Sequence, residues 1–323
     1  MLIVPPDESP KTRHADPIKS VHLAVKEEYR GAFRSKSYTD ICTQVQKHLK
    51  TTSSKRKSRN QDYTHLLEPK QEVLSSIIHC TTHLPSLLLD YFDASLHACN
   101  LCGSLIESID QARADHRILR RVLELATASQ CTEDQHHSMA SNLVLFSKLD
   151  NPFSGPNPTR FERIHEAYGS MARQLVSAHR KLMRRLRCMN LGVGIGSAAT
   201  CGVIAMVENV VVGEEGSVAR EGSQLDAAAR GAFALDRGFD TMSRMVRRLH
   251  DEVEHGRDVI RLFMEEEDME GGWMMLREVV RELQLSEGRF MEQLAELEEH
   301  VCLCFLNINS ARRMVLEEIV IPR

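Results

Sequence analysis

Apolar residues recur in alternating steps of three and four along the second half of the chain. The first series is Ile164, Tyr168, Met171, Leu175, Ala178 and Leu182. The second is Leu235, Phe239, Met242, Val246, Leu249, Val253, Gly256, Ile260 and Phe263. The third is Phe290, Leu294, Leu297, Val301, Cys304, Ile308, Ala311 and Val315. This spacing keeps apolar side chains on one face of a helix and is typical of helices that pack at shallow angles.

An earlier segment, from Leu87 to about Ala126, predicts a less regular helix. Its apolar side carries Phe92, Cys99, Cys102, Ile106 and Ile109. No segment shows the sustained two-residue alternation of a strand, and no proline interrupts the chain from Thr159 to Ile321. The sequence therefore predicts an all-α fold, in which long antiparallel helices form a coiled-coil-like bundle with a short central hydrophobic segment.

Prolines, glycines and polar runs predict where the chain divides. The expected parts are a flexible N-terminal tail (1–20), an N-terminal helical region (21–150) with a basic linker (50–62), a proline-rich linker (151–160), a helix ending in a basic cluster (161–190), a hydrophobic segment (191–213) and C-terminal coiled-coil-like helices (214–323).

The hydrophobic segment begins with seventeen uncharged residues, Leu191 to Val207. A basic flank precedes it, made of Arg180, Lys181, Arg184, Arg185 and Arg187. A bilayer-spanning helix needs roughly 20 apolar residues, and basic flanks tend to stay in the cytosol. The predicted membrane residues are Leu191, Gly192, Gly196, Val203, Ile204 and Val207. The competing interpretation is a glycine-rich hinge or a buried turn between bundle helices.

Composition narrows the function classes. A net charge of −4 over 323 residues gives no support for a nucleic-acid partner. The nine cysteines are scattered and odd in number, which indicates a reducing, cytosol-facing compartment. The N-terminal residues lack the basic and apolar regions of a signal peptide.

Three patterns resemble chemical sites, but core packing or chance explains each of them. Cys99 and Cys102 fall on the apolar side of a predicted helix, and no second CxxC completes a zinc site. The pairs Glu162–His165 and Glu252–His255 match a di-iron spacing, but glutamate and histidine are common enough here to produce such pairs by chance. We expect no catalytic residue, cofactor, metal or small-molecule substrate.

Four stretches resemble a known family, the plant fourteen-a-like group. They run from Glu27 to Cys42, from Tyr91 to Asp110, from Leu225 to His255 and from Leu297 to Leu316. The group is described as integrin-like and is related more loosely to bypass-type plant proteins. The resemblance implies helical domains around central hydrophobic segments, a membrane location and no defining enzymatic activity.

Together these features predict a non-enzymatic, membrane-associated helical anchor or scaffold. It would bind protein partners through its helical surfaces, and its helical regions would face the cytosol at a membrane such as the plasma membrane. The alternative is a soluble, cytoplasmic helical scaffold that makes no contact with a bilayer.

Overall fold

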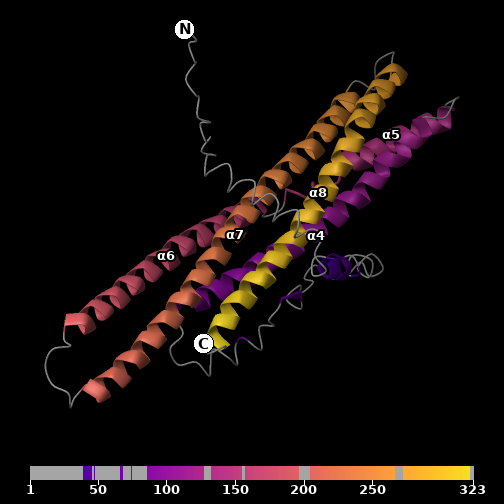
Figure 1. Cartoon of the computed structure of the whole chain (residues 1–323). Coiled ribbons are helices and arrows are strands. Elements are labelled where there is room, and N and C mark those ends of the chain that lie inside the picture. Colours follow the sequence, from indigo (N-terminus) through magenta and orange to yellow (C-terminus); the bar gives the residue numbers. More distant parts are fainter. Residues whose placement is uncertain are drawn as a thin grey trace, which may run out of the picture.

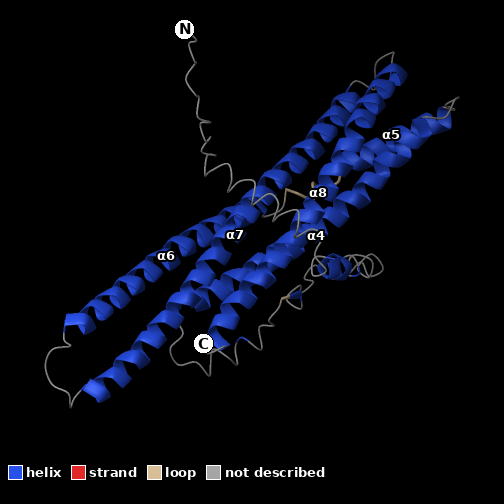
Figure 2. Ribbon diagram, in the orientation of Figure 1, coloured by secondary structure: helices blue, strands red, loops and turns tan. Residues whose placement is uncertain are grey.

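The computed structural model describes most of the chain from residue 86 onward. The described residues are 39–45, 47, 66–67, 74, 86–126, 132–154, 157–195, 204–265 and 272–320. Five long helices account for most of them: α4 (Ser86–Ala126), α5 (Glu133–Ser147), α6 (Asn157–Ile195), α7 (Ile204–Glu265) and α8 (Gly272–Val320). Residues 39–45 are helical as well, and the described ranges contain no strand (Figure 2). The predicted all-α fold is confirmed.

The helices lie side by side as an elongated bundle (Figure 1). The middle helix, α7, packs along both α6 and α8, and the chain reverses direction from each of these helices to the next. A fourth helix, α4, packs against α8 and α6, and α5 folds back against the end of α4. The paired ends of α6 and α7 extend past the C-terminal end of α8, so the bundle has one narrow, two-helix arm.

The predicted apolar stripes form the core. In the series on α6, α7 and α8, all side chains are buried except those of Ala178 and Val253 and the position of Gly256, which are half-buried. The side chain of Phe263 lies outside the described residues. The five stripe residues of α4 are also buried. The chain therefore forms its hydrophobic core by packing long helices at shallow angles, as the three-four spacing indicates.

Two hydrophobic clusters share the bundle. The larger one joins α4, α6, α7 and α8 and ends at Ala112 on α4 and Phe290 on α8. The smaller one joins the far end of α4, α5, the end of α7 and the start of α8; it begins at Leu119 on α4 and ends at Leu283 on α8. Between these limits Asp115 and His116 of α4 lie near Ser286 and Glu287 of α8, so a layer of polar side chains separates the two cores.

The turn between α5 and α6 is fixed by a buried asparagine. The side-chain amide of Asn151 donates to the carbonyl oxygen of His250 at 3.1 Å and to Glu254 at 2.8 Å. Its amide oxygen accepts the backbone N–H of Phe153 at 3.0 Å, and Phe153 is buried in the larger core. The connection predicted as a plain proline-rich linker is thus packed against α7 at its first three residues.

The expected transmembrane helix is a wrong prediction. Among the described residues, no helix has both the length and the apolar character needed to cross a bilayer. The apolar end of α6 runs only from Leu191 to Ile195 and directly follows its arginine-rich turns. Spanning needs about 20 apolar residues, and α7 acquires acidic side chains within its first turns, at Glu208 and Glu214. Residues 196–203 lie outside the described residues.

Candidate functional site

A groove runs between α6 and α7 toward the narrow arm of the bundle. Its volume is about 680 Å³. Its walls are Ala172, Arg173, Val176, Ser177, Arg180 and Arg184 on α6 and Asp226, Ala229, Arg230 and Phe233 on α7. We call this feature the α6–α7 groove.

The floor of the α6–α7 groove is apolar, and part of it is exposed. Phe233 leaves 61% of its surface exposed and Val176 leaves 37%. The guanidinium of Arg237 lies over the Phe233 ring at 5.9 Å from its centroid, a cation–π contact. A large aromatic side chain held at the surface in this way is unusual in a bundle whose other aromatic rings are mostly buried, and it is a common anchor in protein interfaces.

The rim of the groove is positively charged. Four arginines line it, at 173, 180, 184 and 230, against a single carboxylate, Asp226. That carboxylate is already paired with Arg230 at 2.6 Å. The remaining guanidinium groups of the rim favour an acidic partner.

The predicted basic flank is divided by the structure. Arg180 and Arg184 line the groove, whereas Lys181, Arg185 and Arg187 are exposed on α6 outside it. Among the predicted membrane residues, Leu191 and Gly192 belong to the last two turns of α6, and Ile204 and Val207 belong to the first turn of α7. Gly196 and Val203 lie outside the described residues.

Sequence reasoning did not single out Phe233, which lines the groove. Phe233 stands two positions before the apolar stripe of α7, which begins at Leu235, so the three-four pattern passes over it. Two signals were available: an aromatic residue off the stripe, and arginines at 173, 180 and 184, whose spacings of seven and four place them along one side of α6.

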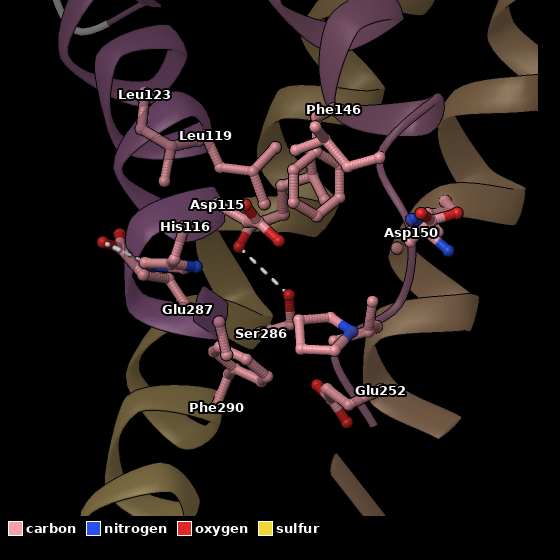
Figure 3. A pocket seen from close by; sticks show the side chains of 17 residues that line it. Asp115, His116, Leu119, Leu123, Phe146, Asp150, Glu252, Ser286, Glu287 and Phe290 are labelled. Carbon is pink, nitrogen blue, oxygen red and sulfur yellow. Dashed lines mark hydrogen bonds and ion pairs between the residues drawn. The ribbon is translucent and has the colours of Figure 1, made fainter. Parts of the chain in front are cut away.

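The second candidate is a small cavity in the polar layer (Figure 3). It measures about 40 Å³, which is room for a few water molecules but not for a metabolite. Asp115 and His116 reach it from α4, and Ser286 and Glu287 from α8. In Figure 3, Ser286 points toward the carboxylate of Asp115, while His116 turns away from both toward Glu287.

The polar pairs around this cavity hold one another in place. His116 Nε2 lies 3.4 Å from a Glu287 carboxylate oxygen, and the His116 ring stacks on Phe290 with centroids 5.4 Å apart. Asp115 accepts a hydrogen bond of 2.6 Å from Gln111. The Ser286 hydroxyl donates to the carbonyl oxygen of Leu283, and His116 Nε2 pairs with Glu287, so these two residues do not form a serine–histidine pair of the kind that activates a nucleophile.

Burial sets the ionisation of this layer. Burial raises the pKa of the Asp115 carboxyl above its ordinary value of 3.8, against the hydrogen bond from Gln111 and the charge of Arg257. Burial lowers the pKa of His116 below its ordinary value of 6.5, against the hydrogen bond and charge of Glu287. Both shifts favour the neutral form, as desolvation does.

The lowered pKa of His116 predicts a pH dependence of stability. Between the folded-state pKa and 6.5 only the unfolded chain binds the proton, so stability is full above 6.5 and is lost as pH falls through the folded-state pKa. The loss is about 1.4 kcal/mol per pH unit inside that window. The pKa of Asp115 is raised, so this carboxyl has the opposite effect: its contribution to stability decreases as pH rises above 3.8. Melting temperatures of His116→Gln between pH 5 and 7 should therefore fall less steeply with acid than those of the unmodified chain.

The matched control for this measurement is His255→Gln. The His255 side chain is 61% exposed on α7, so this variant removes an exposed imidazole in place of a buried one. If the melting temperatures of His116→Gln and of the unmodified chain fell equally steeply with acid, the lowered pKa of His116 would be contradicted.

The Glu162–His165 pair lies on an exposed helix face, and the Cys99–Cys102 pair lies in the core. Glu162 and His165 are exposed on α6, with His165 2.9 Å from Asp236. No group of three or more metal-binding side chains occurs within the described ranges. Cys99 and Cys102 are buried in the larger core.

Three further thiols lie near one another or near Cys102: Cys302 and Cys304 on α8, and Cys42 in residues 39–45. Burial, together with the neighbouring Cys304, raises the pKa of the Cys102 thiol, and contact with Cys42 together with burial raises that of Cys302. Thiols held neutral in this way are poor nucleophiles and poor metal ligands.

The fold and the groove define an all-helical bundle protein with a basic groove that contains an exposed aromatic side chain. A family model described as "Protein of unknown function (DUF677)" matches residues 35–213. UPF0496 protein 2 of Oryza sativa subsp. indica is 33% identical over 97% of this chain and 94% of its own length. UPF0496 protein At1g20180 of Arabidopsis thaliana is 28% identical over 92% and 90% of the two chains. The chain belongs to this family of plant proteins, UPF0496. No solved structure matches it.

This assignment corrects the resemblance drawn from the sequence. The chain is a plant-family protein, as the four stretches indicated, but the family is UPF0496 and not a fourteen-a-like or bypass-type group. The integrin-like description came from that resemblance and is likewise unsupported. The relatives carry family names only, so they supply no catalytic residue, ligand or partner to transfer to this chain.

Proposed function

We propose that this chain is a non-enzymatic helical scaffold that binds a protein partner in the α6–α7 groove. The observation that carries the proposal is the exposed Phe233 ring, which stands inside a groove with an apolar floor and four arginines on its walls. Interfaces are enriched in aromatic and arginine side chains, and such residues carry much of the binding energy.

The rest of the bundle supports this role. The seam residues of four helices are used internally, so the long helices hold the groove walls in a fixed relation. The cavity of about 40 Å³ in the polar layer is too small for a metabolite. The compartment we propose is the cytosol, because the nine cysteines are scattered in the way of a protein kept reduced.

Affinity purification from plant cell extract tests the proposal. The tagged chain is compared with Phe233→Asp, which places a charge in the groove, and with Leu262→Asp as the control. Leu262 is 62% exposed on the same helix and lies outside the groove, so the two substitutions change the same kind of surface. At least one protein should be retained by the unmodified chain and by Leu262→Asp but reduced about tenfold or more by Phe233→Asp.

Circular dichroism melting of the three proteins serves as the fold control, since neither side chain is in the core. If no retained protein distinguishes Phe233→Asp from Leu262→Asp while all three melt alike, the groove is not the binding surface.

A further inference from the structure

The walls of the α6–α7 groove restrict what can fill it, and this restriction extends the proposed function. From Arg173 to Arg184 the α6 wall spans eleven residues, which is about 17 Å at 1.5 Å per residue. The facing wall on α7 presents Asp226, Arg230 and Phe233, at spacings of four and three. The α7 wall spans seven residues, or about 10 Å, so the two walls together match about two to three turns of a third helix.

The apolar positions of the groove form a strip between charged rims. Ala172 and Val176 face it from α6, and Ala229 and Phe233 from α7. Ala172 is half-buried and Ala229 is buried, whereas Val176 and Phe233 are exposed. An occupant that covers the exposed pair must therefore present an apolar stripe, as an amphipathic helix does when it lies in a groove.

The positive charge of the rim favours an occupant with negatively charged side chains. Arg173, Arg180 and Arg184 stand along one wall, and Arg230 on the other wall has its carboxylate partner, Asp226, within the groove itself. Acidic side chains that flank the apolar stripe of an occupant would meet the arginines of α6, and basic ones would be repelled.

We propose that the occupant of the α6–α7 groove is an acidic amphipathic helix of a partner protein. This inference rests on the proposed function and adds the chemistry of the partner. Its apolar stripe contacts Phe233 and Val176, and its flanking carboxylates pair with Arg180 and Arg184. A flat anionic bilayer would meet the exposed cations of α6 inside and outside the groove alike, so it would not distinguish Arg180 and Arg184 from Lys181 and Arg185.

The test uses the full chain and a fluorescent, helix-stapled peptide of about twelve residues, because an unconstrained helix of that length is marginal in water. The peptide carries leucines at helical spacing and glutamates beside them. A second peptide has the same composition in scrambled order. Vesicles of equal parts phosphatidylcholine and phosphatidylserine report on lipid binding.

Two double variants separate groove binding from general charge. Arg180→Glu with Arg184→Glu reverses the charges inside the groove. Lys181→Glu with Arg185→Glu makes the same change in net charge on the same helix, one residue further along and outside the groove. Phe233→Ala tests the aromatic anchor, with Leu262→Ala as its control.

The acidic peptide should bind the unmodified chain in fluorescence anisotropy, and the scrambled peptide should not. The dissociation constant should rise about tenfold or more for Arg180→Glu with Arg184→Glu and for Phe233→Ala, and by less than about twofold for the two controls.

Three results would overturn the inference: no binding of the acidic peptide, equal binding of the scrambled peptide, or equal weakening by both double variants. Vesicle binding that both double variants abolish, without peptide binding, would assign the cations to a lipid surface instead. A partner that depends on Phe233 in the affinity purification, but no binding of the acidic peptide, would leave the proposed function standing and remove only the acidic-helix chemistry.

Discussion

Truncating Phe239 to alanine is expected to lower the free energy of unfolding by about 3–5 kcal/mol, the usual cost of removing a buried phenyl ring. Phe239 is 1% exposed at the centre of α7. Its ring stacks on Tyr168 of α6 with centroids 6.1 Å apart and an interplanar angle of 10°. The centroid of the Phe161 ring lies 6.5 Å from that of Phe239. These rings join α6 to α7, so the groove walls depend on them. Urea unfolding followed by circular dichroism measures the loss.

The control for this prediction is Tyr168→Phe. The Tyr168 side chain is fully buried, and its hydroxyl has no hydrogen-bond partner among the described residues. Removing a buried, unsatisfied hydroxyl keeps the ring contact and should change stability by less than about 1 kcal/mol, or increase it. If Phe239→Ala cost no more than Tyr168→Phe, the α6–α7 packing described above would be wrong.

Gly231→Ala is expected to destabilise the bundle by about 1–3 kcal/mol, because the core has no space for an added methyl group. A Cβ atom at Gly231 would lie 2.5 Å from the Tyr91 hydroxyl oxygen and 2.9 Å from the Ala311 Cβ atom. Tyr91 is fully buried, and Ala311 has no side-chain torsion that could move its Cβ away. Relief therefore requires α7 and α8 to separate. Thermal unfolding gives the effect as a lower melting temperature.

At a second glycine on α7, Gly238, the same substitution is expected to increase stability. No atom lies within 4 Å of the position that a Cβ would take at Gly238. Gly238→Ala should therefore raise stability by up to about 1 kcal/mol through helix propensity alone. Two identical substitutions seven residues apart should thus change the melting temperature in opposite directions. A gain in stability for both would show that α7 and α8 are not in contact at Gly231.

The helices and their buried faces could be predicted because they depend on local periodicity. The stripes from Leu235 to Leu249 and from Phe290 to Val315 are buried as the three-four spacing indicated. The hydrophobic segment was misjudged because its lack of charge and its basic flank were given more weight than its many glycine, alanine, serine and threonine residues. Absence of charge is a weaker signal than hydrophobicity for membrane insertion.

The polar layer and the groove could not be predicted, because they depend on the register between helices that are distant in sequence. Asp115 and Arg257 are both buried, yet each stands among charged neighbours in the sequence and resembles an ordinary surface residue. Arg257 is held by Glu254 at 3.0 Å, and Glu254 by Asn151 from another element. Burying such residues is favourable only once those partners meet, which a single helix cannot reveal.

The most direct test of the α6–α7 groove as a protein-binding surface is photo-crosslinking in plant cells. The intact chain carries the photoreactive residue p-benzoyl-phenylalanine in place of Phe233, or in place of Leu262 as the control position. We predict a protein adduct from position 233 that is absent from position 262 and that disappears when Arg180→Glu and Arg184→Glu are introduced. Adducts of equal yield from both positions, or no protein adduct from position 233, would contradict the account.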